Sequence, residues 1–191
     1  MIVHNFDPVL IDLGFLQIRW YSIAYILGIL IGWIYAIKII RNTRKNQYNF
    51  TQISELEFND LIIYLVIGII FGGRLGYVLF YNLGYFSQNF LEIFKIWHGG
   101  MSFHGGLLGV IISIIIFSKK NKINFFKIAD IVSCVSPIGI FFGRIANFIN
   151  GELYGKISTV PWSVIFPGAG DVSRHPSQVY EAILEGIILF M

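Results

Sequence analysis

The sequence has few charged residues: Asp, Glu, Lys and Arg make up 13% of its 191 positions, against about 25% in a soluble globular domain. Hydrophobic residues make up 55%. This composition excludes an ordinary soluble enzyme and predicts an integral membrane protein. The net charge of +3 has to be interpreted by its position along the chain, and it gives no indication of a nucleic-acid partner.

The sequence has a single cysteine, Cys134, which excludes an intrachain disulfide and a cysteine-based metal cluster. Cys134 lies within an apolar stretch, where a free buried cysteine usually acts as an inert small hydrophobe. The N-terminus also lacks the basic region of a signal peptide, so nothing predicts cleavage there. We therefore expect no nucleophile of the chain's own.

Long apolar stretches dominate what is present. A membrane span needs about 20 apolar residues in helical form, and four stretches meet this requirement: residues 20–40, 61–81, 101–117 and 125–149. A fifth helix begins at Pro176, a residue suited to a first helical turn, and its apolar run to residue 191 is too short to cross. The sequence predicts an all-α polytopic helical bundle with four full spans and a truncated fifth. We expect residues 1–191 to form a single membrane-embedded domain.

Positive charges in the loops predict the orientation. Lys and Arg gather on the cytoplasmic side of membrane proteins, and here they gather in the first and third loops: Lys38, Arg41, Arg44, Lys45, Lys119, Lys120, Lys122 and Lys127. The N-terminus, the second loop and the segment 150–175 are then predicted to face outward, away from the cytoplasm.

Each predicted span contains two glycines four residues apart, a spacing that lets helix backbones approach closely in lipid. The pairs are Gly28/Gly32, Gly72/Gly76, Gly105/Gly109 and Gly139/Gly143. Tight packing of the bundle is sufficient to account for most of them.

Polar residues within the spans are expected to mark a functional site. With the predicted orientation, six of them fall in one layer beneath the outer surface: Tyr21, Arg74, His104, Arg144, Asn147 and Glu152. Snorkelling, or an ion pair with Glu152 or Glu181, explains one arginine equally well. Two arginines with a histidine in one layer favour a site.

The residue types in this layer fit an anion. Arginine matches phosphate oxygens, and a neutral histidine can accept a proton near neutral pH. A metal site is poorly supported, because the six-residue gap between His98 and His104 does not match the usual spacing of zinc ligands. His98, beside Trp97, is interpreted as an interface residue.

Four segments, "GGRLGYVLFYN", "WHGGMSFHGGLLG", "GRIANFINGELYGK" and "RHPSQVYEAILEG", closely resemble the prolipoprotein diacylglyceryl transferase family. The resemblance implies an enzyme of the bacterial inner membrane whose active site faces the periplasm. It implies transfer of the diacylglyceryl group of phosphatidylglycerol to the lipobox cysteine of a prolipoprotein signal peptide, which forms a thioether and releases glycerol phosphate. It implies no cofactor and no metal.

The resemblance also assigns site residues by position. Candidate catalytic residues are His104, Arg144 and Tyr21. Candidate phosphatidylglycerol-binding residues are Arg144, Asn147, Glu152 and Gly155, together with Arg74, which is selected by its place in the polar layer and not by the resemblance. His104 serves either as the base or to orient the lipid. Two positions depart from the family signature: Ala146 replaces a glycine, and Lys156 replaces an arginine and so loses the bidentate fork.

The resemblance implies a longer protein, with two further spans and a second essential arginine beyond residue 191. We therefore expect the sequence to be a truncated member. Two alternatives stay open: a non-enzymatic anion- or lipid-binding transport protein, and an inactive remnant of the transferase.

Overall fold

The structure, a computed structural model, describes residues 2–14, 17–45, 53–96 and 99–191. The predicted interface role of Trp97 and His98 lies outside these residues. The chain forms two compact units, one of Met1–Ala36 with Val132–Met191 and one of residues Ile37–Ile131. The expected single domain stays a prediction.

Four long helices confirm the predicted fold class. They are α1 (Trp20–Lys45), α2 (Glu55–Phe80), α4 (Phe103–Asn121) and α5 (Phe125–Asn150). Each is long and apolar enough to cross a membrane. Many large apolar side chains on them are exposed, as expected of helices whose outer faces contact lipid.

Helix α2 starts earlier than predicted because of its N-terminal cap. The Ser54 hydroxyl accepts a hydrogen bond from the Glu57 N–H at 3.2 Å, and the Ser54 N–H donates to the Glu57 carboxylate at 2.7 Å. This capping box satisfies free N–H groups at the helix start. Arg41 on α1 also forms a bidentate ion pair with Glu55, at 2.8 and 2.9 Å. A prediction that counts only apolar residues misses this polar first turn.

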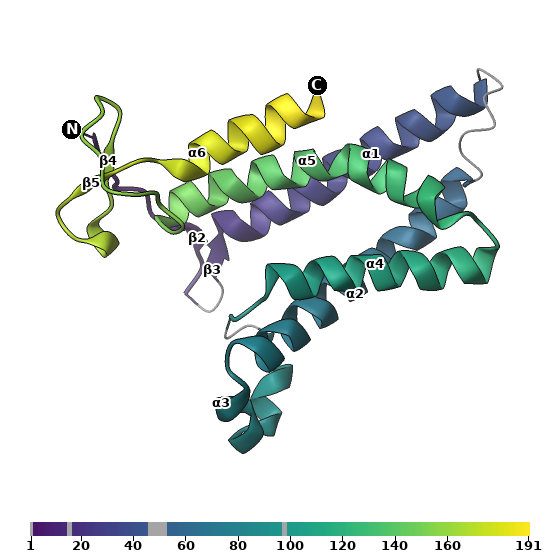
Figure 1. The fold of residues 1–191 in the computed structure, drawn as a ribbon, viewed down its shortest axis with the longest axis horizontal. Coiled ribbons are helices and arrows are strands. Elements are labelled where there is room, and N and C mark those ends of the chain that lie inside the picture. Colours follow the sequence, from purple (N-terminus) through teal and green to yellow (C-terminus); the bar gives the residue numbers. More distant parts are fainter. Residues whose placement is uncertain (1, 15–16, 46–52, 97–98) are drawn as a thin grey trace. The chain divides into compact units, whose positions relative to one another are not determined.

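In the unit of residues 37–131, α2 and α4 lie side by side and contact each other through glycines (Figure 1). A Cβ atom on Gly76 would lie 2.7 Å from the Gly105 Cα, and one on Gly72 would lie 2.9 Å from the Gly109 Cα. A Cβ on Gly109 would overlap the Gly68 carbonyl. Two of the predicted glycine pairs therefore do serve close helix packing. Beyond α2 follow the short α3 (Leu83–Gln88) and the 3-10 helix η1 (Phe90–Phe94).

This contact makes a prediction about stability. Gly109→Ala should lower the free energy of unfolding by about 1–3 kcal/mol, the usual cost of overpacking, because the new methyl group meets a backbone carbonyl that cannot turn aside. The thermal midpoint in detergent measures this. Gly106→Ala on the same helix is the control, since a Cβ there meets only the Ile69 carbonyl at 3.9 Å. Equal midpoints for the two variants would contradict the packing argument.

In the other unit, α5 packs against α1 and against the last helical segment. A Cβ on Gly28 would lie 3.1 Å from the Gly139 Cα, and one on Gly186 would lie 2.7 Å from the Phe141 Cβ. The predicted fifth helix is present as α6 (Ser177–Glu181), which continues as a π-helix, η4 (Ala182–Ile188). Cys134, expected to be buried, is exposed on α5, so that expectation is wrong.

Short strands, which the sequence analysis did not predict, complete this unit (Figure 1). β1 (Ile2–Val3) pairs in parallel with β4 (Val164–Ile165), which pairs antiparallel with β5 (Ser173–Arg174). β2 (Val9–Asp12) pairs antiparallel with β3 (Gln17–Arg19). The 3-10 helix η3 covers Pro167–Ala169. The strands bring the N-terminal segment and the segment after α5 together beside the end of α5.

Candidate functional site

A hydrogen-bonded group of three predicted site residues lies at the end of α5. The buried Asn147 is 5% exposed. Its side-chain Nδ2 donates to the Glu152 Oε1 at 2.8 Å and to the Tyr21 hydroxyl at 3.1 Å. One amide thus joins the start of α1 to the segment that follows α5. The group presents a carboxylate and a phenol hydroxyl, which can accept from and donate to a hydroxyl-bearing ligand.

The turn after α5 places Glu152 within reach of Asn147. Gly151 has a φ of +67°, a left-handed conformation that glycine adopts without strain. The Glu152 N–H donates to the Asn147 carbonyl at 3.1 Å. The Asn150 Nδ2 adds a longer hydrogen bond to the Glu152 Oε1, at 3.4 Å. The sequence "NFINGE" therefore folds back on itself, with Glu152 directed at the helix that precedes it.

Gln178 on α6 is a site residue that the sequence analysis did not select. It is fully buried, and its Nε2 donates to the Glu152 main-chain carbonyl at 2.5 Å. It therefore fixes the backbone that carries the Glu152 carboxylate. A buried glutamine is unusual, but sequence alone does not show which polar residue of a helix start will be buried. Its presence in the matched segment "RHPSQVYE" was the available signal.

Gly155 has a packing role in this structure. Its N–H donates to the His175 carbonyl at 2.9 Å. A Cβ at this position would lie 3.0 Å from both the Cβ and the carbonyl oxygen of His175. Only glycine lets the two chain segments cross this closely. Lipid binding by Gly155 stays a prediction.

Arg144 is held by two carboxylates of the last helical segment. Its Nε lies 2.9 Å from the Glu181 Oε2, and its Nη2 lies 3.4 Å from the Glu185 Oε2. Its side chain is 30% exposed. Glu181 was one of the partners weighed from the sequence, and Glu185 was not. A guanidinium carries five N–H donors, and the Arg144 Nη1 makes no hydrogen bond to a described residue, so a phosphate can bind there beside the two carboxylates.

The other two predicted site residues belong to the unit of residues 37–131. Arg74 on α2 is 5% exposed, and all its hydrogen bonds described here go to main-chain carbonyls. His104, in the first turn of α4, is exposed; its ring lies 5.6 Å from the Phe103 ring, and it makes no hydrogen bond to a described residue. The predicted common layer combines residues of both units and stays a prediction.

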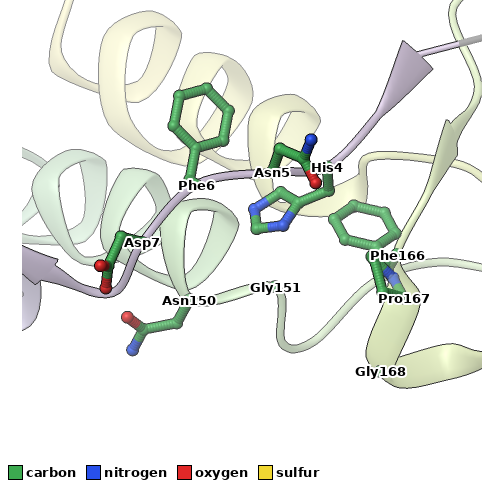
Figure 2. A pocket seen from close by; sticks show the side chains of 9 residues that line it. All are labelled: His4, Asn5, Phe6, Asp7, Asn150, Gly151, Phe166, Pro167 and Gly168. Atoms are coloured by element: carbon green, nitrogen blue, oxygen red, sulfur yellow. The ribbon is translucent and has the colours of Figure 1, made fainter.

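A cavity of about 380 Å³ lies beside the turn that carries Glu152 (Figure 2). The His4 ring forms one wall, where its Nε2 bonds the Phe148 carbonyl at 2.7 Å and it packs against Phe166. None of the lining residues is Lys or Arg: they are His4, Asn5, Phe6, Asp7, Asn150, Gly151, Phe166, Pro167 and Gly168. With Asp7 in its wall, the cavity suits an uncharged polar group better than a phosphate.

The sequence is similar throughout to proteins of one family. The model of the prolipoprotein diacylglyceryl transferase family matches residues 8–191. A Rhizobium meliloti (strain 1021) protein named phosphatidylglycerol–prolipoprotein diacylglyceryl transferase is 50% identical over 185 residues, which cover 97% of this chain and 66% of that protein. A protein of the same name from Phenylobacterium zucineum (strain HLK1) is 48% identical, and the match covers 98% of this chain and 68% of that protein. Another, from Sinorhizobium medicae (strain WSM419), is 49% identical, and the match covers 96% of this chain and 65% of that protein. The chain spans about two thirds of the length of these relatives.

Proposed function

The chain belongs to the prolipoprotein diacylglyceryl transferase family, and from this membership we propose that it transfers the diacylglyceryl group of phosphatidylglycerol to the lipobox cysteine of a prolipoprotein. The names of its relatives state both substrates. The observation that carries the proposal is the group of Tyr21, Asn147 and Glu152, joined by hydrogen bonds of 2.8 and 3.1 Å. Arg144 lies one turn before Asn147 on α5.

The proposed reaction is a substitution at the glyceryl carbon that bears the phosphate. The cysteine sulfur forms a bond to this carbon, and the carbon–oxygen bond to the phosphate breaks, so that its electron pair leaves with glycerol phosphate. The thiol reacts as the thiolate, so its proton passes to a base. The chain supplies a cation for the leaving phosphate, and the nucleophile comes from the peptide substrate.

Each residue then has a stated role. Arg144 binds the phosphate through its Nη1, which has no partner among the described residues, as charge develops on the leaving oxygen. Asn147 holds the Glu152 carboxylate and the Tyr21 hydroxyl toward the glyceryl oxygens. His104 accepts the thiol proton or orients the lipid. Arg74 donates its hydrogen bonds to main-chain carbonyls in the structure.

We place the protein in the bacterial inner membrane with the site facing the periplasm. The four apolar helices support a membrane location. The accumulation of Lys and Arg in the first and third loops supports the orientation, because these residues gather on the cytoplasmic side. The partners are then phosphatidylglycerol and the signal peptide of a prolipoprotein.

The proposal is tested with purified protein in phosphatidylglycerol liposomes and a lipobox peptide. The expected product is the peptide with the diacylglyceryl mass on its cysteine, detected by mass spectrometry. A relative of full length is assayed in parallel as the positive control. Lipid binding or flux without an adduct, while the relative is active, would favour the transport-protein alternative, and neither binding nor adduct would favour an inactive remnant.

A further inference from the structure

The Arg74 guanidinium is buried within the loop between α2 and α4. Its Nε donates at 2.9 Å, its Nη1 at 2.5 and 3.1 Å, and its Nη2 at 2.6 and 3.3 Å. All the acceptors are main-chain oxygens of one short stretch of the chain: Glu92, Ile93, Lys95, Gly99 and Gly100. The Phe86 ring covers the guanidinium, with 5.0 Å between its centroid and the Cζ atom.

These contacts use every donor that an arginine has, since a guanidinium carries five N–H groups. A phosphate could bind Arg74 only if carbonyls were released from it, and each released carbonyl would become an unpaired buried acceptor, which is unfavourable. A phosphate oxygen would therefore replace partners that are already in place, and would not fill a free position. The geometry suits a guanidinium that organises the backbone around it.

The same side of α2 fixes the entry into α4. Gly99 and Gly100 have φ angles of +82° and +81°, and a side chain on Gly100 would overlap the Tyr77 ring. The Ser102 N–H then donates to the Gly73 carbonyl at 2.9 Å. Ser102 is the N-cap of α4, and its hydroxyl accepts from the Gly105 N–H at 3.2 Å. The segment 99–102 is thus held at both ends: Arg74 donates to the carbonyls of its first two residues, and Gly73 accepts from the N–H of its last residue.

His104 depends on this arrangement. It follows the N-cap by two residues, and its ring has no hydrogen bond to a described residue, so the backbone alone sets its position. We propose that Arg74 is a positioning residue: by binding the main-chain carbonyls of Glu92, Ile93, Lys95, Gly99 and Gly100, it sets where α4 begins and therefore where His104 is presented. The inference rests on the proposed function only in giving His104 a role in transfer.

Hydrogen exchange tests the inference without any transfer assay. In Arg74→Lys, one ammonium group with three donors cannot reach the same set of carbonyls. We expect amide exchange in residues 89–102 to become at least tenfold faster, since exchange reports local opening, while residues 61–72 and 108–118 keep their protection. Arg41→Lys, the same change at an arginine whose side chain is 62% exposed, should leave exchange in all three segments unchanged.

Two outcomes of the exchange experiment would overturn the inference. One is unchanged exchange of the loop in Arg74→Lys. The other is equal acceleration throughout α2 and α4, which would mean a general loss of folding. In the transfer assay, Arg74→Lys should lower kcat and leave the KM for phosphatidylglycerol unchanged; a raised KM with unchanged kcat would instead assign Arg74 to the phosphate. A failure of the proposed transfer would leave the exchange result intact.

Discussion

Arg144→Gln should lower kcat/KM for diacylglyceryl transfer by at least about 10²–10³-fold, the usual loss when a donor to a developing oxyanion is removed. The arginine carries the positive charge that the leaving phosphate requires, and glutamine keeps the polarity without the charge. Arg144→Lys should retain part of the activity, because lysine keeps the charge and loses the fork. Mass spectrometry of the lipobox peptide measures both variants.

Glu185→Gln provides the matched control for Arg144. The Glu185 side chain is 47% exposed and holds Arg144 at 3.4 Å, while Glu181 holds it at 2.9 Å. Removal of this carboxylate should therefore leave folding intact and take away a negative charge that repels the phosphate, so the KM for phosphatidylglycerol should fall. A large loss of kcat in Glu185→Gln, equal to that of Arg144→Gln, would mean that the ion pair itself serves the reaction and that Arg144 does not bind the phosphate.

The spans could be predicted from the sequence because the bilayer imposes a simple rule of length and apolarity. The predicted stretches 20–40, 61–81, 101–117 and 125–149 correspond to α1, α2, α4 and α5. The polar first turn of α2 could not be predicted in this way. It is stabilised by its cap and by the ion pair with Arg41, and neither changes the hydropathy of the chain.

The sequence predicted that paired glycines would serve close helix packing, but it did not predict which of the pairs would do so. Gly72, Gly76, Gly105 and Gly109 lie in the contact between α2 and α4, and Gly139 lies close to Gly28, whereas a Cβ on Gly143 would meet nothing within 4 Å. The spacing of glycines shows that a close approach is possible. Which helix makes the approach depends on tertiary packing, and the spacing does not record it.

The candidate site was predictable to a similar degree. The sequence grouped Tyr21, Asn147 and Glu152, and the structure joins them by hydrogen bonds. It did not select Gln178, whose side chain contacts Glu152 from 26 residues later in the chain. It also gave Arg74 and Arg144 the same task, although one donates to carbonyls and the other to carboxylates. Depth in the membrane cannot distinguish between these partners.

Asn147→Asp should be the second most damaging change for transfer. Its activity should fall by about 10²-fold, because it removes two hydrogen bonds of about 1–1.5 kcal/mol each. The substitution keeps the shape of the side chain, so no cavity forms. It removes the donor to the Tyr21 hydroxyl and to Glu152, and it places a second negative charge 2.8 Å from the Glu152 Oε1, where Asn147 now donates. Like charges this close destabilise each other.

The effect of Asn147→Asp should depend on pH, because protonation of the introduced carboxyl removes its charge and restores an O–H donor toward Glu152. The activity of the variant relative to the unaltered protein should therefore rise as the pH falls. Asn150→Asp makes the same change at a residue that reaches the same Glu152 oxygen at 3.4 Å, and its loss should be about tenfold smaller, since hydrogen bonds weaken with distance. Equal losses in the two variants, or a relative activity of Asn147→Asp that does not change with pH, would show that the Asn147 amide does not act by holding the Glu152 carboxylate.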